Sequence, residues 1–307
     1  MSARRSNRGK RKTSDHVDAE RVDNGLPVRL FATDRYPCER VNTYSTVDLL
    51  LWVRDALKGK PEMDILMGSC FGGLFQIPTR RLLAGKVVHS MMTRQLVTMK
   101  KYEMWPVFGG NPFRFSLVEF GEVTGLPCGE FEEGYSIDYK LPETEENYAH
   151  WDTLFGGNRD ATIEDIVALV ESDDQIPRDI RLKLCLVVIV DGVLIASLQK
   201  PKPTLKYVKL LERLDDFLAF PWGRESFLWT ISTLKPPLKV MGKCEDPLGV
   251  FCNKLRQQTI KAVGFPLALQ LVAFRAIPQL LQLAAGDDTI NLINYAETSL
   301  PKHAGLT

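Results

Sequence analysis

Apolar residues recur at helical spacing along most of the chain after residue 25. Runs of strict alternation between apolar and polar residues, which mark half-buried strands, are short and few. The segments with helical spacing are 46–57, 80–104, 180–198, 204–220, 224–234, 247–263 and 266–277. This pattern predicts a mainly α, multi-helix globular protein, in which Thr46 caps the first helix and 180–198 is buried.

Segment 80–104 is the longest of these amphipathic stretches. Its apolar positions cover one broad face, and the basic residues around that face are opposed by Glu103 alone. These basic residues are Arg80, Arg81, Lys86, Arg94, Lys100 and Lys101. Two interpretations stay open. The helix is a docking face for an acidic partner or a phosphate backbone, or it is a solvated face with salt bridges to an acidic loop downstream.

The strongest local signal lies in residues 103–129. Ser116 stands at a helix N-cap position and Glu119 follows three residues later, which is the spacing of a capping box. Gly125 offers the left-handed residue that ends a helix, and Pro127 prevents its continuation. The sequence therefore predicts a short helix at 117–124 with both ends specified.

The phenylalanines beside this helix predict how it docks. Phe115 precedes the cap and Phe120 occupies the fourth helical position, which is the spacing of a hydrophobic staple. A helix of two turns is not stable alone in water, so it must pack against the rest of the protein. The stretch is interpreted as structural, and Arg114 is its one candidate for contact with a partner.

Residues 130–146 interrupt the helical pattern inside a predicted domain at 26–286. The acidic residues there are Glu130, Glu132, Glu133, Asp138, Glu143, Glu145 and Glu146, opposed by Lys140 alone. This composition predicts a surface loop within one domain, or a linker between two lobes at 26–129 and 147–286. The spacing of the carboxylates is too irregular for a calcium loop. Residues 287–307 are expected to form a frayed C-terminal tail.

The first 25 residues lack apolar periodicity and predict a disordered tail. Its basic cluster consists of Arg4, Arg5, Arg8, Lys10, Arg11 and Lys12. Because the net charge of the whole chain is only +1, the remainder is mildly acidic, which speaks against a large nucleic-acid-binding face. The cluster is typical of a nuclear localisation signal, and a solubilising or RNA-adhesive tail is the alternative.

The sequence lacks the usual templates for catalysis and cofactor binding. No dinucleotide-binding glycine motif follows a strand, and the pairs Gly85-Lys86 and Gly242-Lys243 lack the other residues of a phosphate loop. The four histidines, His16, His89, His150 and His303, are too scattered for a zinc site. We expect no enzyme activity, no cofactor and no small-molecule substrate. Cys128 with His89 or His150 is the nucleophile pair that sequence alone leaves open.

The six cysteines show no CxxC spacing, which indicates free thiols in a reducing compartment. The longest apolar stretch, 184–198, is short and contains Asp191, so it does not fit a transmembrane helix. The basic N-terminus has no apolar stretch behind it and does not read as a secretory signal. We therefore expect no membrane association.

A series of motifs follows in fixed order along the chain, among them Thr-Gly-Leu-Pro at 124–127 and Phe-Pro-Trp-Gly-Arg at 220–224. The full series occupies 82–89, 94–96, 103–105, 112–120, 123–128, 151–156, 191–194, 220–224 and 264–268. Together these motifs resemble the plant family known as domain of unknown function 1985, between residues 60 and 285. The helix followed by Thr-Gly-Leu-Pro also resembles the plant mobile domain, more distantly.

The resemblance implies a lineage of Mutator-like transposable elements, in which this domain often precedes a SUMO-protease-like cysteine peptidase domain. That peptidase needs an ordered series of His, Asp, Gln and Cys, which the residues after 286 do not supply. The chain therefore resembles the amino-terminal module without the peptidase. The family offers no established catalytic residues to carry over.

Three hypotheses about function follow. The first is a non-enzymatic nuclear interaction module of transposon-derived origin that binds protein partners, with nucleic acid contacted through the basic tail. The second is a substrate-recognition domain that works with a SUMO-protease-like cysteine peptidase in another chain. The third is a DNA-binding protein.

Overall fold

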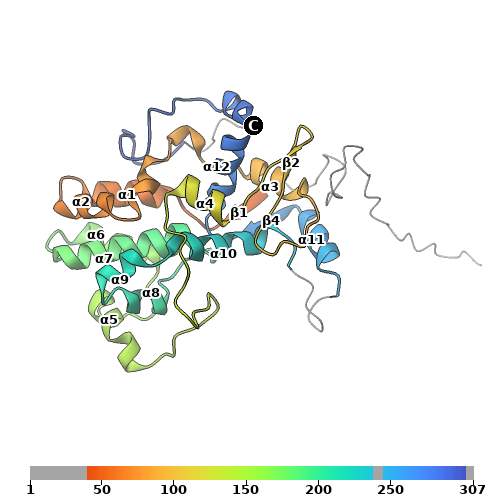
Figure 1. Ribbon diagram of the computed structural model, residues 1–307. Coiled ribbons are helices and arrows are strands. Elements are labelled where there is room, and N and C mark those ends of the chain that lie inside the picture. The colour runs from red at the N-terminus through yellow and green to blue at the C-terminus, as the bar shows by residue number, and fades with distance from the viewer. Residues whose placement is uncertain (1–39, 238–244, 302–307) are drawn as a thin grey trace, which may run out of the picture.

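The computed structural model describes residues 40–237 and 245–301 (Figure 1). The predicted tail at 1–25, with its basic cluster, lies outside the described residues. The helices are α1 (Asp48–Leu57), α2 (Pro61–Gly68), α3 (Gly85–Thr93), α4 (Leu117–Thr124), α5 (Glu145–Phe155), α6 (Ile163–Ser172), α7 (Arg178–Ile189), α8 (Leu205–Leu210), α9 (Leu214–Ala219), α10 (Trp222–Leu234), α11 (Pro247–Leu255) and α12 (Leu267–Ala276). The strands are β1 (Arg40–Thr43), β2 (Val107–Phe108), β3 (Asn111–Pro112) and β4 (Thr259–Ala262). The mainly helical prediction is confirmed.

Helix α4 begins and ends where the local signal predicts. The Ser116 hydroxyl accepts the Val118 N–H at 3.2 Å, and the Glu119 carboxylate accepts the Ser116 N–H at 3.0 Å. Gly125 closes the helix with a φ of 71°, in the left-handed region that favours glycine. The capping box and the glycine stop are both confirmed.

Three phenylalanine rings dock α4 against α10. The ring centroids of Phe115 and Phe120 lie 6.4 Å apart, and each lies within 6 Å of Phe227, at 5.8 and 5.7 Å. On its other side α4 contacts α12. The predicted staple therefore joins the helix to the core, with all three rings almost fully buried.

The single helix predicted for 80–104 is wrong. A 3₁₀ turn at Thr79–Arg81 precedes the much shorter α3, and the chain beyond α3 runs extended, with isolated bridges from Gln95 to Pro106 and from Met104 to Phe115. The side chain of Gln270 on α12 explains the late start of α3. It accepts the Ala84 N–H at 2.6 Å, so a distant residue satisfies a backbone group that a continuous helix would use.

The helix predicted for 247–263 is also wrong beyond Leu255. Strand β4 follows α11 and pairs in parallel with β1, with Arg40 opposite Thr259. Residues in β4 alternate between exposed and buried, as expected for a strand covered on one side. The alternating pattern of β4 covers only 4 residues, which is too short to predict a strand from the sequence. Its partner, β1, lies near the other end of the described chain.

Two predicted helices are divided. Segment 204–220 forms α8 and α9 instead of one helix, which allows both Tyr207 and Phe217 to contact Trp222, at ring-centroid distances of 5.2 and 4.7 Å. Segment 180–198 forms α7 and then a π-helical turn at Val190–Leu194. Helix α7 and the π-helical turn are both buried, as predicted for segment 180–198.

The predicted cap at Thr46 is not formed. Helix α1 begins at Asp48 without a side-chain cap, and the backbone N–H of Thr46 instead donates to the carbonyl of Gly192 at 3.1 Å. A Cβ atom at Gly192 would lie 2.5 Å from Leu49 Cδ1. The absence of a side chain at 192 therefore lets α1 approach the π-helical turn.

The helices pack around one buried core. Helix α7 contacts α1, α2 and α6, while α10 crosses the middle of the molecule between α4 and β4 (Figure 1). Buried apolar residues before and after the acidic segment belong to the same core cluster. That segment runs over the surface from α4 to α5, and its last two acidic residues, Glu145 and Glu146, form the first turn of α5.

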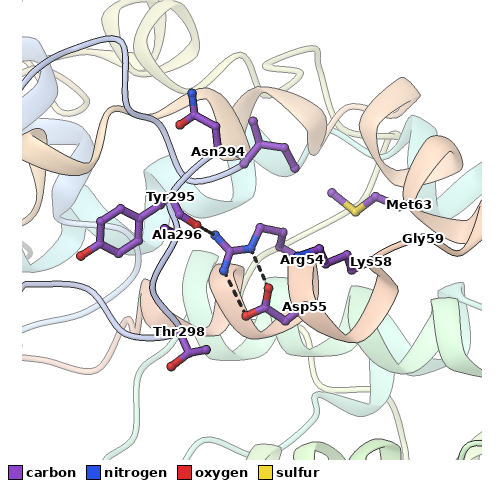
Figure 2. A pocket seen from close by; sticks show the side chains of 10 residues that line it. Arg54, Asp55, Lys58, Gly59, Met63, Asn294, Tyr295, Ala296 and Thr298 are labelled. Atoms are coloured by element: carbon purple, nitrogen blue, oxygen red, sulfur yellow. Dashed lines mark hydrogen bonds and ion pairs between the residues drawn. The ribbon is translucent and has the colours of Figure 1, made fainter.

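The C-terminal tail is not frayed where the structure describes it. Leu292 is fully buried, and the guanidinium group of Arg54 donates to the carbonyl oxygens of Leu292 at 2.9 Å, Tyr295 at 2.6 Å and Glu297 at 3.1 Å. Figure 2 shows Arg54 reaching across to this segment from α1. Residues 291–300 are therefore fastened to the N-terminal helix. Among the described helices, none has the length and apolar character to cross a lipid bilayer.

Candidate functional site

A groove of about 710 Å³ runs along α10. Its lining is mainly apolar and aromatic and includes Tyr102, Leu117, Phe131, Tyr135, Ile137, Phe227, Leu228, Ile231, Pro236 and Pro237. The charged residues that line it are Lys101, Arg224 and Lys235, opposed by Asp138. We call this feature the α10 groove.

The floor of the groove follows from the helical repeat of α10. Phe227 and Ile231 are four residues apart and lie on one face of the helix, with Leu228 beside them. Phe227 turns inward to the rings of α4, while Leu228 stays half-buried. Leu117, the first residue of α4, also lines the groove at what we call its foot. Its position is fixed because the capping box determines where α4 begins.

Lys235 ties one bank of the groove to the end of α10. Its ammonium group is buried and donates to the carbonyl oxygens of Lys100 and Glu103, the second at 2.8 Å. Burial lowers the pKa of Lys235. The residues between those two carbonyls, Lys101 and Tyr102, line the groove, so this buried cation fixes their position.

Arg224 ties the start of the acidic segment to α10 on the opposite bank. Its guanidinium group donates to the carbonyl of Gly129 and to the carboxylate of Glu130, the latter at 2.7 Å. It also lies 5.9 Å from the ring centroid of Phe131, close enough for a cation–π contact. Phe131 is thereby held along the groove.

Lys206 of α8 ties the middle of the acidic segment. Its ammonium group donates to the hydroxyl of Tyr135 and to the carbonyl of Ile137, both at 2.9 Å, and lies 3.3 Å from Glu225 of α10. All three of its N–H groups therefore have partners. The acidic segment, predicted as a surface loop, is in this part a fixed wall.

Glu225 is the buried anion at the centre of this arrangement. It is fully buried, and it accepts the hydroxyl of Tyr207 as well as Lys206. Burial raises the pKa of Tyr207, and the neighbouring Glu225 raises it further. Burial followed by Glu225 likewise raises the pKa of Tyr135, so both phenols stay protonated.

A smaller hollow of about 170 Å³ continues the groove past Pro237, since both share Lys235, Pro236 and Pro237. It is lined by residues 95–99, and Met99 there is 89% exposed. Tyr102 beside it is 47% exposed. Apolar side chains this accessible, next to a groove, are typical of a surface that binds another molecule.

The predicted partner-binding residues are not collected on one face. Arg80 and Arg81 both bind Asp288, at 2.7 and 2.6 Å, and Arg81 followed by Arg80 lowers the pKa of that carboxyl to about 2. Arg114 pairs with Glu119 at 2.7 Å. The arginines therefore bind carboxylates of their own chain.

The remaining predicted cations are divided between α3 and the groove. Lys86 is exposed in the first turn of α3, and Arg94 follows its last residue. Lys101 lines the groove and Lys100 precedes it in the chain, and both are exposed. Within the described chain neither has a carboxylate at salt-bridge distance, and the ammonium of Lys101 lies 4.7 Å from the ring centroid of Tyr102.

The residues weighed as a nucleophile pair have other contacts. The Cys128 thiol donates to the carbonyl of Leu126 at 3.5 Å, and burial raises its pKa. The ring of His89 lies 3.3 Å from the Leu255 carbonyl, and His150 lies 3.5 Å from the Lys183 ammonium. No cluster of three or more metal-ligating side chains occurs among the residues that the structure describes.

The second large cleft, of about 610 Å³, lies between α1 and residues 293–298. Figure 2 shows Arg54 at its centre with Asp55 beside it. The Arg54 side chain donates to three carbonyls and to the Asp55 carboxylate at 2.8 Å, which uses its donors fully. Arg54 in this cleft therefore has a structural role, because it holds residues 292–297 against α1.

Sequence reasoning missed the residues that shape the groove. Lys206 and Glu225 lie within the predicted helices 204–220 and 224–234, and Lys235, Pro236 and Pro237 follow the second of them, but the sequence singled out none of the five. A charged residue on the apolar side of an amphipathic helix is the available signal, and Glu225 carries it, three residues after Trp222.

Part of the chain matches a known protein family. Residues 92–233 match the family model for Domain of unknown function (DUF1985). The predicted family is therefore confirmed over this part of the chain, which holds α4, the acidic segment and most of α10. Neither a curated protein nor a solved structure matches the chain.

Proposed function

We propose that this protein is an interaction module that binds a segment of a partner protein in the α10 groove. The observation that carries the proposal is an apolar groove with two exposed side chains at one bank, Tyr102 in its lining and Met99 in the adjoining hollow. The two lysines between them in the sequence pair with no carboxylate of the described chain. The partner segment inserts apolar side chains into the groove and carries acidic residues beside them.

Charge complementarity favours an acidic segment. Lys100 and Lys101 lie on a bank where the described carboxylates leave them unpaired, so a carboxylate of the partner gains contacts that the free protein lacks. Rim charges of this kind mainly raise the association rate and select the partner, while buried apolar anchors supply most of the affinity. Met99 suits such an anchor because its thioether side chain adapts to different surfaces.

The fixed banks favour binding without rearrangement. Lys235, Arg224 and Lys206 each hold a bank through hydrogen bonds to backbone carbonyls. A surface that is ordered before the partner arrives loses less conformational entropy on binding. This supports recognition of a short segment, for which such losses decide the affinity.

The test is selection of peptides from a random display library on the full chain. We expect enriched peptides with two or more apolar residues flanked by Asp or Glu. By fluorescence polarisation, their affinity should fall at least tenfold in Met99→Glu and in the double variant Lys100→Glu/Lys101→Glu. Lys58→Glu, an equally exposed charge reversal at the Arg54 cleft, is the matched control and should bind as the wild type does.

Two results would overturn the proposal. One is enrichment of peptides without acidic residues; the other is equal binding by the groove variants and the control. A titration with a DNA duplex at low salt, where phosphate contacts are strongest, runs beside it. Duplex binding that the double lysine variant removes, without peptide binding, would assign the surface to nucleic acid instead.

The nuclear location and the transposon-derived lineage belong to the same proposal and rest on the basic tail and the family resemblance. Reporter fusions of residues 1–25 and 26–307 test the location: import with the first and its loss with the second are expected. The substrate-recognition hypothesis adds one requirement, which is that the selected peptide or its source protein associates with a SUMO-protease-like peptidase.

A further inference from the structure

Another pocket, of about 240 Å³, shares part of the acidic segment with the groove, since Ile137 and Asp138 line both. Its apolar lining includes Ile195, Leu198 and Pro201, and Lys140, Lys202 and Lys206 also line it. Three of its lining residues are aromatic: Tyr139, Tyr207 and Trp229. We call it the Asp191 pocket, after its one fully enclosed carboxylate.

Asp191 is held in place by the backbone around it. It lies in the π-helical turn Val190–Leu194 and is 3% exposed. The hydroxyl and the N–H of Thr204 donate to its two oxygens, at 2.5 and 3.2 Å. Two neutral hydrogen bonds leave further lone pairs on each oxygen, and π-helical turns are frequent at functional sites.

No cation of the described chain lies at salt-bridge distance from Asp191, although Lys206 lines the same pocket and its charge lowers the pKa of the carboxyl. Two of the lysines that line the pocket pair with other carboxylates. Lys206 pairs with Glu225 at 3.3 Å, and Lys202 pairs with Asp160 at 3.0 Å. Burying a carboxylate without a cation is costly, so a bound cation would gain strongly here.

We propose that the Asp191 pocket binds a small organic cation, an alkylammonium group, which pairs with the Asp191 carboxylate while its carbon chain contacts the apolar wall. Aromatic faces beside a carboxylate are the usual surroundings of a bound ammonium, since the ring quadrupole attracts positive charge. Tyr139, at 53% exposed, stands at the mouth where such a group would enter.

The protonation of Asp191 makes this binding depend on pH. Burial raises the pKa of Asp191 to about 7, the Thr204 hydrogen bonds and the charge of Lys206 acting in the opposite direction. The other ionisable groups that line the pocket are Asp138, Tyr139, Lys140, Lys202 and Tyr207. Because the ionised carboxylate binds the cation, affinity should rise about tenfold from pH 6 to pH 8.

The experiment uses the full chain and butylammonium or butyltrimethylammonium as the probe. At pH 8 either cation should shift the indole N–H resonance of Trp229, assigned with Trp229→Phe, in a saturable manner. Butyrate and 1-butanol, which match the probe in size, should not. We expect Asp191→Asn to weaken binding at least tenfold and Tyr139→Ala at least threefold. The matched control Asp179→Asn, at an exposed aspartate of α7 that does not line the pocket, should stay within twofold.

The same ammonium chemistry has two sources, a free amine or a lysine side chain of a protein. A glycine-flanked peptide with one lysine or trimethyllysine distinguishes them: tighter binding of the peptide assigns a protein side chain, and tighter binding of the free probe assigns a metabolite. Saturation by butyrate or butanol, or an unchanged affinity in Asp191→Asn together with no dependence on pH, would overturn the site. Because Tyr139→Ala changes an exposed residue, it keeps the test valid if Asp191→Asn misfolds.

Discussion

The α10 groove and the Asp191 pocket share residues of the acidic segment, but their buried charged side chains differ in how they are paired. At the groove, the buried ammonium of Lys235 donates to two carbonyl oxygens and holds one bank. Lys206, which lines the pocket and holds the segment that the two hollows share, donates to a carbonyl and a phenol and pairs with Glu225. In the pocket, Asp191 is held only by the neutral Thr204. A buried charged group that has its partners fixes the shape of a surface. We propose that a buried charged group without an ionic partner, such as Asp191, binds a ligand of opposite charge.

The first prediction concerns the Lys206–Glu225 pair, whose loss should affect both the groove and the pocket. Lys206→Met removes the cation beside the fully buried Glu225 and frees the wall that both hollows share. A buried ion pair that loses one partner typically costs about 3–5 kcal/mol, so the free energy of unfolding should fall by that amount in urea titrations. The double variant Lys206→Met/Glu225→Gln should recover part of the loss. Equal stability of the single and double variants would show that the pair is not coupled.

The second prediction concerns the pocket alone. The pKa of Asp191 is raised to about 7, so the folded state prefers the protonated carboxyl. Its stabilising contribution is complete below the ordinary pKa near 3.8 and is lost as the pH rises through 7. Relative to Asp191→Asn, the wild type should lose about 2–3 kcal/mol of unfolding free energy between pH 5 and pH 8. Parallel curves for the two proteins would contradict it.

The third prediction concerns the groove alone. Lys235→Met removes the donor to the carbonyls of Lys100 and Glu103, which loosens the bank that carries Tyr102. Because solvent can reach those carbonyls, the expected loss of stability is about 1–2 kcal/mol. Affinity for a groove peptide should fall at least tenfold while butylammonium binding is unchanged. Loss of both activities would mean that the two hollows are not separate.

The smallest effect tests the foot of the groove. Ser116→Ala removes the cap of α4, and Thr162→Ala removes the equivalent cap of α6, where Asp165 completes the capping box. Each should cost about 1 kcal/mol in thermal or urea unfolding. Only Ser116→Ala should weaken peptide binding, because Leu117 lines the groove and α6 does not. Equal effects on binding would point to general destabilisation.

The contrast between α4 and residues 80–104 explains which parts of the fold were predictable. Every group that fixes α4 lies within a few residues of it, from Ser116 to Gly125. The start of α3 is decided by Gln270, and strand β4 by a partner at Arg40–Thr43. Local spacing carries no information about such partners, so amphipathic spacing alone overextended both helices.

The same reason limits prediction of the two hollows. The groove combines residues of α4, α10, the acidic segment and the chain at 101–102, and Lys206 of α8 holds one wall from outside. The residues that fix its banks were not distinguishable by type or spacing. Lys100 and Lys101 were recognised as candidates from charge alone, and Lys101 lines the groove. Asp191 was noticed only as an interruption of an apolar run, although a carboxylate there already required an explanation.

The fastening of residues 291–300 by Arg54 has a consequence for synthesis of the protein. The carbonyl oxygens that Arg54 binds lie 238 to 243 positions later in the chain. At about 5–20 residues per second, a ribosome needs roughly 12–50 seconds to supply them. During that interval residues 291–300 are absent, so the Arg54 guanidinium lacks its carbonyl partners and the apolar residues of α1 that this segment covers remain exposed. The nascent chain therefore depends on a late segment to close an early helix, and the N-terminal half is the part that a chaperone would need to shield.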